Sequence, residues 1–119
     1  MSKNSLCHLE ISVTDAIKAS EFYQSIFGWK IDNAMGDGYV FFQPESGPGG
    51  AFSKVEEHKP GTNVVAYVEV DDIEAYLKKA VEAGGKEIVP KTPIPGHGWF
   101  AHAGDLDGNI IGLYTGEPK

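Results

Sequence analysis

The sequence predicts an α+β fold built from two βαβββ modules, and three observations support this prediction. Residues 8–31 and residues 65–88 share one pattern of an alternating segment, an amphipathic segment and a Gly-containing return segment. A shift of 57 residues superimposes the two copies. The matched pairs are Ile11 with Val68, Asp15 with Asp72 and Gly28 with Gly85. An acidic candidate for the N-cap precedes each amphipathic segment. A repeat of this length indicates a duplicated supersecondary unit.

The first module is predicted over about residues 6–56. Residues 7–13 alternate in period two, which predicts a strand with His8, Glu10 and Ser12 on its polar face. Thr14 or Asp15 caps a helix that Gly28 ends. The buried positions expected on this helix are Ala16, Ala19, Phe22, Tyr23 and Ile26. The other strands are expected just after Gly28, at Tyr39–Gln43 and at Ala51–Val55, with a Pro/Gly loop over Pro44–Gly50 and a link over Glu56–Thr62.

The second module is predicted over about residues 62–115. Residues 63–70 repeat the first strand and place Tyr67 and Glu69 on one face. Asp71 or Asp72 caps the second helix, and Gly84-Gly85 ends it. The buried stripe expected on that helix consists of Ile73, Tyr76, Leu77, Ala80 and Val81. Three prolines predict a loop over Pro90–Gly98. An Asp-Gly turn joins two further strands, Trp99–Ala103 and Asn109–Tyr114.

The composition of the 119 residues predicts one soluble domain. Apolar residues make up 41% and charged residues 23%, which are ordinary values for a globular chain. We expect no membrane span, because no apolar run reaches about 18 residues, and no signal peptide at the N-terminus. The single cysteine, Cys7, cannot form an internal disulfide, which favours a cytoplasmic protein and a buried, inert thiol. The net charge of −7 argues against nucleic-acid partners.

Six stretches of the chain together resemble a known superfamily. They are residues 8–15, Phe22-Tyr23, Phe27-Gly28-Trp29, residues 68–73, Ala83-Gly84-Gly85 and residues 105–109. They resemble the vicinal oxygen chelate superfamily, which includes glyoxalase I, bleomycin-resistance proteins and extradiol dioxygenases, and the similarity covers nearly the whole chain. The resemblance implies a cup-shaped, half-barrel mixed sheet with the helices outside, a small-molecule site inside the cup, and a homodimer.

The resemblance also raises the question of a metal. Metal-dependent relatives such as glyoxalase I hold one divalent ion with four side chains, from the first and last strands of each module. His8 stands at one of these positions, but Val65 and Gly112 stand at two others. The fourth position lies within Gly49–Val55, which contains no carboxylate, histidine or cysteine. We therefore expect no metal and no other cofactor at the usual position.

Three functional hypotheses follow from these residues. The leading one is a metal-free protein that binds a small organic molecule in the cup. The second is a lyase or isomerase in which Glu10 is the general base and His8 its partner, because a carboxylate facing a partly apolar cup suits that work. The third is a glyoxalase-like or dioxygenase-like enzyme with a displaced divalent metal site, in which His102 joins His8 and Glu10.

The predicted ligand-binding residues combine aromatic rings with polar groups, as small-molecule pockets do. They are His8, Glu10, Tyr67, Trp99, His102 and Tyr114. Trp99 and His102 have opposite parity on their strand, so only one of them faces the cup, and the sequence leaves open which one. His97, between two glycines, is either an exposed loop residue or part of a lid over a ligand. His58 is given no role.

Overall fold

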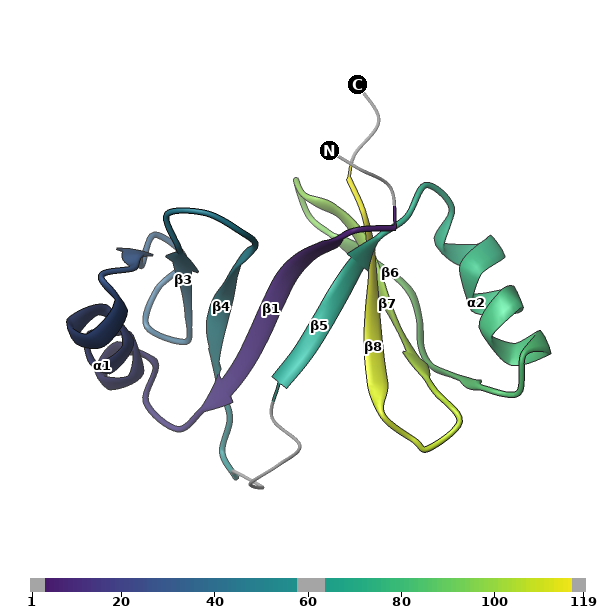
Figure 1. Cartoon of the computed structure of the whole chain (residues 1–119), viewed down its shortest axis with the longest axis horizontal. Coiled ribbons are helices and arrows are strands. Elements are labelled where there is room, and N and C mark those ends of the chain that lie inside the picture. Colours follow the sequence, from purple (N-terminus) through teal and green to yellow (C-terminus); the bar gives the residue numbers. More distant parts are fainter. Residues whose placement is uncertain (1–3, 58–63, 117–119) are drawn as a thin grey trace. The chain divides into compact units, whose positions relative to one another are not determined.

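The computed structural model describes residues 4–57 and 64–116, and the chain divides into two compact units. One unit holds Cys7–Val65, and the other combines Met1–Leu6 with Ala66–Lys119. They follow the predicted repeat closely, so we call them module one and module two. Each contains four strands and one helix (Figure 1). The α+β class and the twice-repeated βαβββ order are therefore confirmed. His58 and residues 58–62 of the predicted link lie outside the described residues.

Module one is a mixed four-stranded sheet with one helix on one face. Its elements are β1 (Leu6–Val13), α1 (Ala16–Phe27), β2 (Lys30–Asp32), β3 (Tyr39–Gln43) and β4 (Gly49–Lys54). The strands lie in the order β2-β3-β4-β1, in which β4 and β1 are parallel and the other pairs are antiparallel. Helix α1 packs against β2, β3 and β4 (Figure 1).

The two ends of α1 are set by the residues that the sequence indicates. The Asp15 side chain accepts a hydrogen bond from the Lys18 backbone N–H at 3.0 Å, which satisfies one of the free donors of the first turn. Gly28 adopts a left-handed conformation with φ of 70°, and its N–H donates to the Gln24 carbonyl at 2.8 Å. A side chain at this φ would be strained, so glycine suits the end of the helix.

Aromatic rings dominate the core of module one. The Phe42 ring lies 4.7 Å from that of Trp29 and 4.9 Å from that of Phe52, measured between centroids. Two predicted core positions of α1 are wrong, because Phe22 is 58% exposed and Ile26 is 54% exposed. The apolar stripe of the helix is wider than the strip that contacts the sheet, so its outer part stays in solvent.

Module two repeats this architecture. Its elements are β5 (Val64–Glu69), α2 (Ile73–Glu82), β6 (Lys86–Ile94), β7 (Gly98–Gly104) and β8 (Ile110–Thr115). The strands lie in the order β5-β8-β7-β6, with a parallel β5–β8 pair and antiparallel pairs elsewhere. Helix α2 packs against β6, β7 and β8 (Figure 1). The cup depends on how the two modules meet, and it stays an expectation from the resemblance.

The core of module two is aliphatic. It includes Val70, Ile73, Leu77 and Leu113, with Ala101 and Ala103 beneath the helix. The Asp72 side chain accepts from the Ala75 N–H at 3.1 Å, which confirms Asp72 as the cap. Val81 was expected in the buried stripe, but it is 50% exposed because it lies on the outer flank of the short helix α2.

Two predicted loops are partly strand. Strand β4 begins at Gly49 rather than Ala51, and the Leu9 carbonyl occupies the place where a Cβ of Gly50 would lie. Glycine at this point permits close strand pairing, and it does not mark a loop. Strand β6 continues through Pro90 and Pro93 to Ile94. It lies at the edge of the sheet, and an edge strand tolerates prolines because the N–H groups on its outer side have no neighbouring strand to bond. Its pairing with β7 is irregular between Glu87 and Thr92.

The predicted Asp-Gly hairpin between β7 and β8 is confirmed. The Asp105 side chain accepts hydrogen bonds from the backbone N–H groups of Asp107 and Asn109 at 2.9 and 2.8 Å. The side-chain amide of Asn109 also donates to Asp105, and this bond is the main cause that lowers the pKa of Asp105. Among the described residues, no helix has the length and apolar character needed to cross a membrane.

Candidate functional site

In each module the helix covers one face of the sheet, and all the candidate residues except Trp99 lie on the opposite face. In module one, β1 places His8 opposite Gly49 and Glu10 opposite Ala51 on β4. Phe41 on β3 is also paired with Ala51. Paired residues of neighbouring strands point to the same side of a sheet. Glu10, Ala51 and Phe41 therefore form one row across the polar face.

A tyrosine connects the two catalytic candidates of module one. The Tyr39 hydroxyl donates a hydrogen bond to Glu10 Oε2 at 2.9 Å, and His8 Nε2 lies 3.2 Å from the same hydroxyl oxygen. Tyr39 comes from β3 and reaches across β4 to β1. The prediction that His8 and Glu10 share a face is confirmed, and Tyr39 joins them.

The electrostatics around His8 favour the neutral ring. Burial lowers the pKa of His8 below its ordinary value of 6.5, and the nearby charge of Glu10 acts in the opposite direction as the smaller cause. A neutral imidazole carries one N–H donor and one nitrogen with a lone pair. Because burial is the larger cause, the neutral imidazole is the favoured form of His8.

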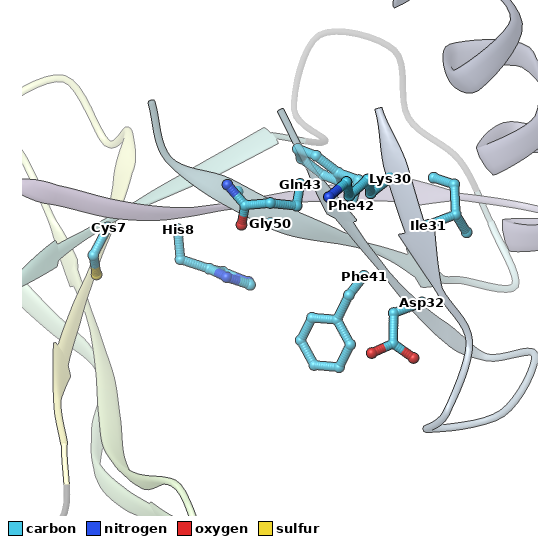
Figure 2. A pocket seen from close by; sticks show the side chains of 10 residues that line it. Cys7, His8, Lys30, Ile31, Asp32, Phe41, Phe42, Gln43 and Gly50 are labelled. Atoms are coloured by element: carbon cyan, nitrogen blue, oxygen red, sulfur yellow. The ribbon is translucent and has the colours of Figure 1, made fainter. Parts of the chain in front are cut away.

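A cleft of about 300 Å³ opens beside His8 within module one. Figure 2 shows the side chains of His8, Phe41 and Asp32 projecting from the same side of the sheet. The lining residues are Cys7, His8, Lys30, Ile31, Asp32, Phe41, Phe42, Gln43, Gly49 and Gly50. Cys7 is only half-buried and lines this cleft, so the expectation of a buried thiol is wrong. The cleft offers a ring, an amide, both signs of charge and an imidazole to a ligand.

Module two also has a tyrosine–histidine hydrogen bond on its polar face. The Tyr67 hydroxyl lies 2.7 Å from His102 Nε2. Strand β8 runs between them, and both residues are paired with Gly112. The Tyr67 ring occupies the space into which a side chain at residue 112 would project. Tyr67 therefore crosses over a residue without a side chain, and it is itself only 7% exposed.

The structure resolves which face of β7 carries the candidates. Phe100 and His102 share the face of Tyr67, and their rings lie 5.6 Å apart in an edge-on arrangement. Trp99 packs against the apolar core beneath α2 instead. Trp99 thus lies on the face opposite His102 and does not join the other ligand-binding candidates. Strand alternation assigns Trp99 and His102 to opposite faces, but it cannot indicate which face is the core.

Tyr114 lies on the same face as Phe100, with which it is paired. Its hydroxyl donates to the backbone carbonyl of His97 at 2.7 Å. His97 sits in the exposed turn between β6 and β7, and its own N–H donates to the Ile94 carbonyl at 2.8 Å. Tyr114 therefore fastens this turn to the sheet, which fits the view of His97 as an exposed loop residue.

The residues at the expected metal positions do not fit a divalent ion. The repeat matches Glu10 of module one with Tyr67 of module two. Their pairing partners on the neighbouring strands are Ala51 and Gly112, so Ala51 is the counterpart of Gly112. Ala51 is therefore the fourth position that the sequence left open. Three of the four positions thus carry Ala51, Val65 and Gly112, which have no donor atom. The part of the chain that is described contains no group of three His, Cys, Asp or Glu side chains placed to hold a metal. The described residues therefore give no support to the displaced metal site of the third hypothesis.

Sequence reasoning missed Tyr39 and Phe41. Both lie in a short aromatic run with Val40 and Phe42, and every member of this run is compatible with a core strand. Alternation places Tyr39 and Phe41 on one face of the strand and Val40 and Phe42 on the other, but it does not say which pair faces the helix. The structure gives the answer, because Val40 and Phe42 are buried beneath α1 while the rings of Tyr39 and Phe41 meet edge-on at 5.2 Å on the polar face.

Similarity to known proteins agrees with this architecture. The sequence pattern of the Glyoxalase/Bleomycin resistance protein/Dioxygenase superfamily matches residues 5–113. A glyoxylase-like domain-containing protein from Didymella fabae is 32% identical over an alignment of 117 positions, which covers 90% of this chain and 90% of that one. The provisionally named glyoxylase CFP32 of Mycobacterium bovis is 26% identical over an alignment of 122 positions, which covers 89% of this chain. This chain spans 43% of the length of that relative and of its Mycobacterium tuberculosis counterpart.

Solved structures of other proteins share this fold. Methylmalonyl-CoA epimerase from Mycobacterium tuberculosis superimposes with a TM-score of 0.71 at 16% identity, over 99% of this chain and 93% of that one. At this identity the likeness concerns the fold alone. The match over residues 5–113 establishes the family, and this chain belongs to the Glyoxalase/Bleomycin resistance protein/Dioxygenase superfamily.

Proposed function

We propose that this protein binds a small organic molecule in the cleft of module one, without the four-residue metal site that the resemblance implies. The cleft itself carries the proposal. Its volume of about 300 Å³ reaches the lower end of the range of about 300–1,000 Å³ that is typical of small-molecule sites. Its lining combines the Phe41 ring with the His8 imidazole and the Gln43 amide, so the cleft offers an organic ligand an aromatic wall and several hydrogen-bonding groups.

The donor set supports the metal-free part of the proposal. Divalent transition ions need several N, O or S ligands that converge from different strands. At the family positions of module one, His8 is accompanied by Ala51 on β4. In module two, the Tyr67 ring fills the space in front of Gly112. We therefore assign the polar groups of the cleft to direct contacts with the organic ligand.

Ligand screening with matched variants tests the binding proposal. Aromatic and cationic compounds are screened by thermal shift, because a ligand that binds only the folded state raises Tm with concentration. For a compound that binds, we expect Phe41→Ala to weaken affinity about tenfold or more, equivalent to about 1.4 kcal/mol. The control is Phe27→Ala, since Phe27 is 59% exposed and does not line the cleft. Equal effects of the two substitutions would rule out this cleft as the binding site.

Elemental analysis of the purified protein tests the absence of the metal site. We expect nickel, zinc, iron and manganese at well below one ion per chain. The His8→Ala variant is the control, because His8 is the one family ligand position that keeps a donor. A stoichiometric metal in the wild type that disappears in His8→Ala would overturn the metal-free proposal.

A second candidate function is proton transfer in a lyase or isomerase that uses Glu10 and His8. The hydrogen-bonded chain from His8 through Tyr39 to Glu10 favours it, because a base, a bridging hydroxyl and a carboxylate are in contact at 3.2 and 2.9 Å beside the cleft. Hydrogen-bonded side chains of this kind can transfer protons in general acid–base catalysis.

The two functions are separated by substituting Glu10. If the protein is a proton-transfer enzyme, Glu10→Gln lowers kcat by a factor of about 10² or more while the ligand still binds. If the protein only binds its ligand, no compound that it binds is converted by the wild type. Retention of full turnover in Glu10→Gln would exclude a catalytic role for this carboxylate.

A further inference from the structure

Two opposite charges lie close together on β2, the edge strand of module one. Lys30 and Asp32 are two residues apart on this strand, so their side chains leave the same face of the sheet. Both side chains are exposed, and both line the cleft of about 300 Å³. Among the described residues that line this cleft, these two alone carry a full charge.

The two charges do not neutralise each other. Neither side chain takes part in an ion pair among the described residues. Asp32 Oδ1 accepts a hydrogen bond from the Ala34 backbone N–H at 2.9 Å, which orients the carboxylate. The second carboxylate oxygen and the three N–H donors of the Lys30 ammonium are therefore available to charged groups of a ligand.

An aromatic ring lies beside this pair of charges. Phe41 on β3 is paired directly with Asp32, and it is the diagonal neighbour of Lys30, which is paired with Gln43. In an antiparallel pair, direct partners have Cβ atoms about 4.5–5.5 Å apart and diagonal neighbours lie about 7–8 Å apart. Figure 2 shows the Phe41 ring and the Asp32 carboxylate projecting together from the sheet. A carboxylate, a ring and an ammonium thus lie within the span of one small molecule.

From this arrangement we infer that the ligand of the cleft is an aromatic zwitterion, that is, an aromatic amino acid or a compound with the same charged groups. The ligand ammonium binds Asp32, the ligand carboxylate binds Lys30, and the ligand ring packs on Phe41. This inference rests on the binding function proposed above and adds the chemical class of the ligand.

The pair of charges disfavours ligands that carry only one charge. An anion bound at Lys30 is repelled by Asp32, and a cation bound at Asp32 is repelled by Lys30. A zwitterion satisfies both groups at once, and the flexible Lys30 side chain can follow the ligand carboxylate. Because both groups are exposed to water, we expect each ionic contact to change affinity only about threefold to fivefold.

Three probes that share one phenyl ring separate the contributions of the two charges. L-phenylalanine carries both charges, phenethylamine lacks the carboxylate, and 3-phenylpropionate lacks the ammonium. Nuclear magnetic resonance titration of the full chain measures the three Kd values at low ionic strength, because salt screens exposed charges. We expect L-phenylalanine to bind at least about threefold more tightly than either singly charged probe.

Two neutralising substitutions test the role of each charge. Lys30→Gln should weaken the binding of L-phenylalanine about threefold to fivefold and should not weaken that of phenethylamine. Asp32→Asn should weaken L-phenylalanine by a similar factor and should not weaken 3-phenylpropionate, and asparagine keeps an acceptor for the Ala34 N–H. The controls are Lys18→Gln and Asp37→Asn, which make the same changes at exposed residues of module one outside the cleft. We expect both controls to bind all three probes as the wild type does.

The outcomes separate this inference from the proposed function. If none of the three probes binds, or if all three bind equally well, the ligand class is wrong. The cleft then remains a binding site if another compound loses affinity in Phe41→Ala. If L-phenylalanine binds but neither Lys30→Gln nor Asp32→Asn weakens it, the inference is also overturned. If Phe41→Ala has no effect on this binding either, the ligand lies outside the cleft.

Discussion

The two modules share one topology but use their polar faces differently. In each, a tyrosine crosses the last strand of its module to reach a histidine on the far side. In module one, Tyr39 on the third strand reaches His8 on the first. In module two, Tyr67 on the first strand reaches His102 on the third. In module two the residue beneath the crossing is Gly112, and the Tyr67 ring occupies the place where a side chain at that residue would lie.

The difference between the modules is a carboxylate. The repeat places Tyr67 where module one has Glu10, so one copy has a ring at the position where the other has an acid. In module two this ring covers Gly112 and is almost fully buried. In module one the acid accepts from Tyr39 beside an open cleft. The two modules thus share one scaffold, and at matched positions one polar face has a carboxylate beside a cleft while the other has a buried ring.

The largest predicted effect concerns the cores, which are aromatic in module one and aliphatic in module two. Phe52 is fully buried and its ring lies 5.1 Å from that of Tyr23. We expect Phe52→Ala to lower the free energy of unfolding by about 3–5 kcal/mol. In module two, Ile73→Val should cost only about 0.5–1.5 kcal/mol. Urea denaturation measures both. The exposed Phe27→Ala is the control, and a Phe52→Ala loss no larger than the control's contradicts this account of the core.

The second prediction tests the crossing in module two. A methyl group at residue 112 would overlap the Tyr67 ring, so Gly112→Ala should displace the ring and break its bond to His102. We expect a loss of about 1–3 kcal/mol, as for overpacked cores. The same change in a Tyr67→Ala background should cost little, and a double-mutant cycle measures this coupling. Equal costs in both backgrounds would show that the ring does not set the requirement for glycine.

The third prediction concerns the matched helix caps, where the two modules should behave alike. Asp15→Ala and Asp72→Ala each remove one bond to a first-turn N–H, so each should cost about 1 kcal/mol. Asp15→Asn is the control, because asparagine caps as well as aspartate. Thermal or urea unfolding provides the measurement. A marked inequality between the two alanine variants would indicate that the caps carry tertiary contacts in one module.

The smallest predicted effect is the pH dependence that His8 gives to module one. Because burial lowers its pKa in the folded state, the unfolded chain takes up this proton first as pH falls below about 6.5. The unfolded state then binds more protons, so stability decreases with falling pH, and above pH 6.5 the contribution vanishes. Relative to His8→Gln, the wild type should lose unfolding free energy between pH 7 and pH 5. Parallel curves over this interval would contradict the shift.

Local patterns in the sequence predicted most of the secondary structure. The caps Asp15 and Asp72, the left-handed Gly28 and the Asp-Gly hairpin were all identified correctly, because each depends on the chemistry of a few neighbouring residues. The prolines of β6 misled the prediction, because whether a missing N–H matters depends on whether the strand is an outer one. The position of a strand in a sheet is not a local property.

The sequence by itself determined the duplicated βαβββ order, the polar parity of His8 and Glu10, and the absence of donor atoms at Val65 and Gly112. Only the tertiary structure decided which face of β7 is core, that Trp99 belongs beneath α2, and that Tyr39 reaches across β4 to join His8 and Glu10. The physical reason is that alternation gives each side chain a side of its strand. Which side is buried, and which side chains meet across an intervening strand, depends on strand order, register and the size of the residue between them.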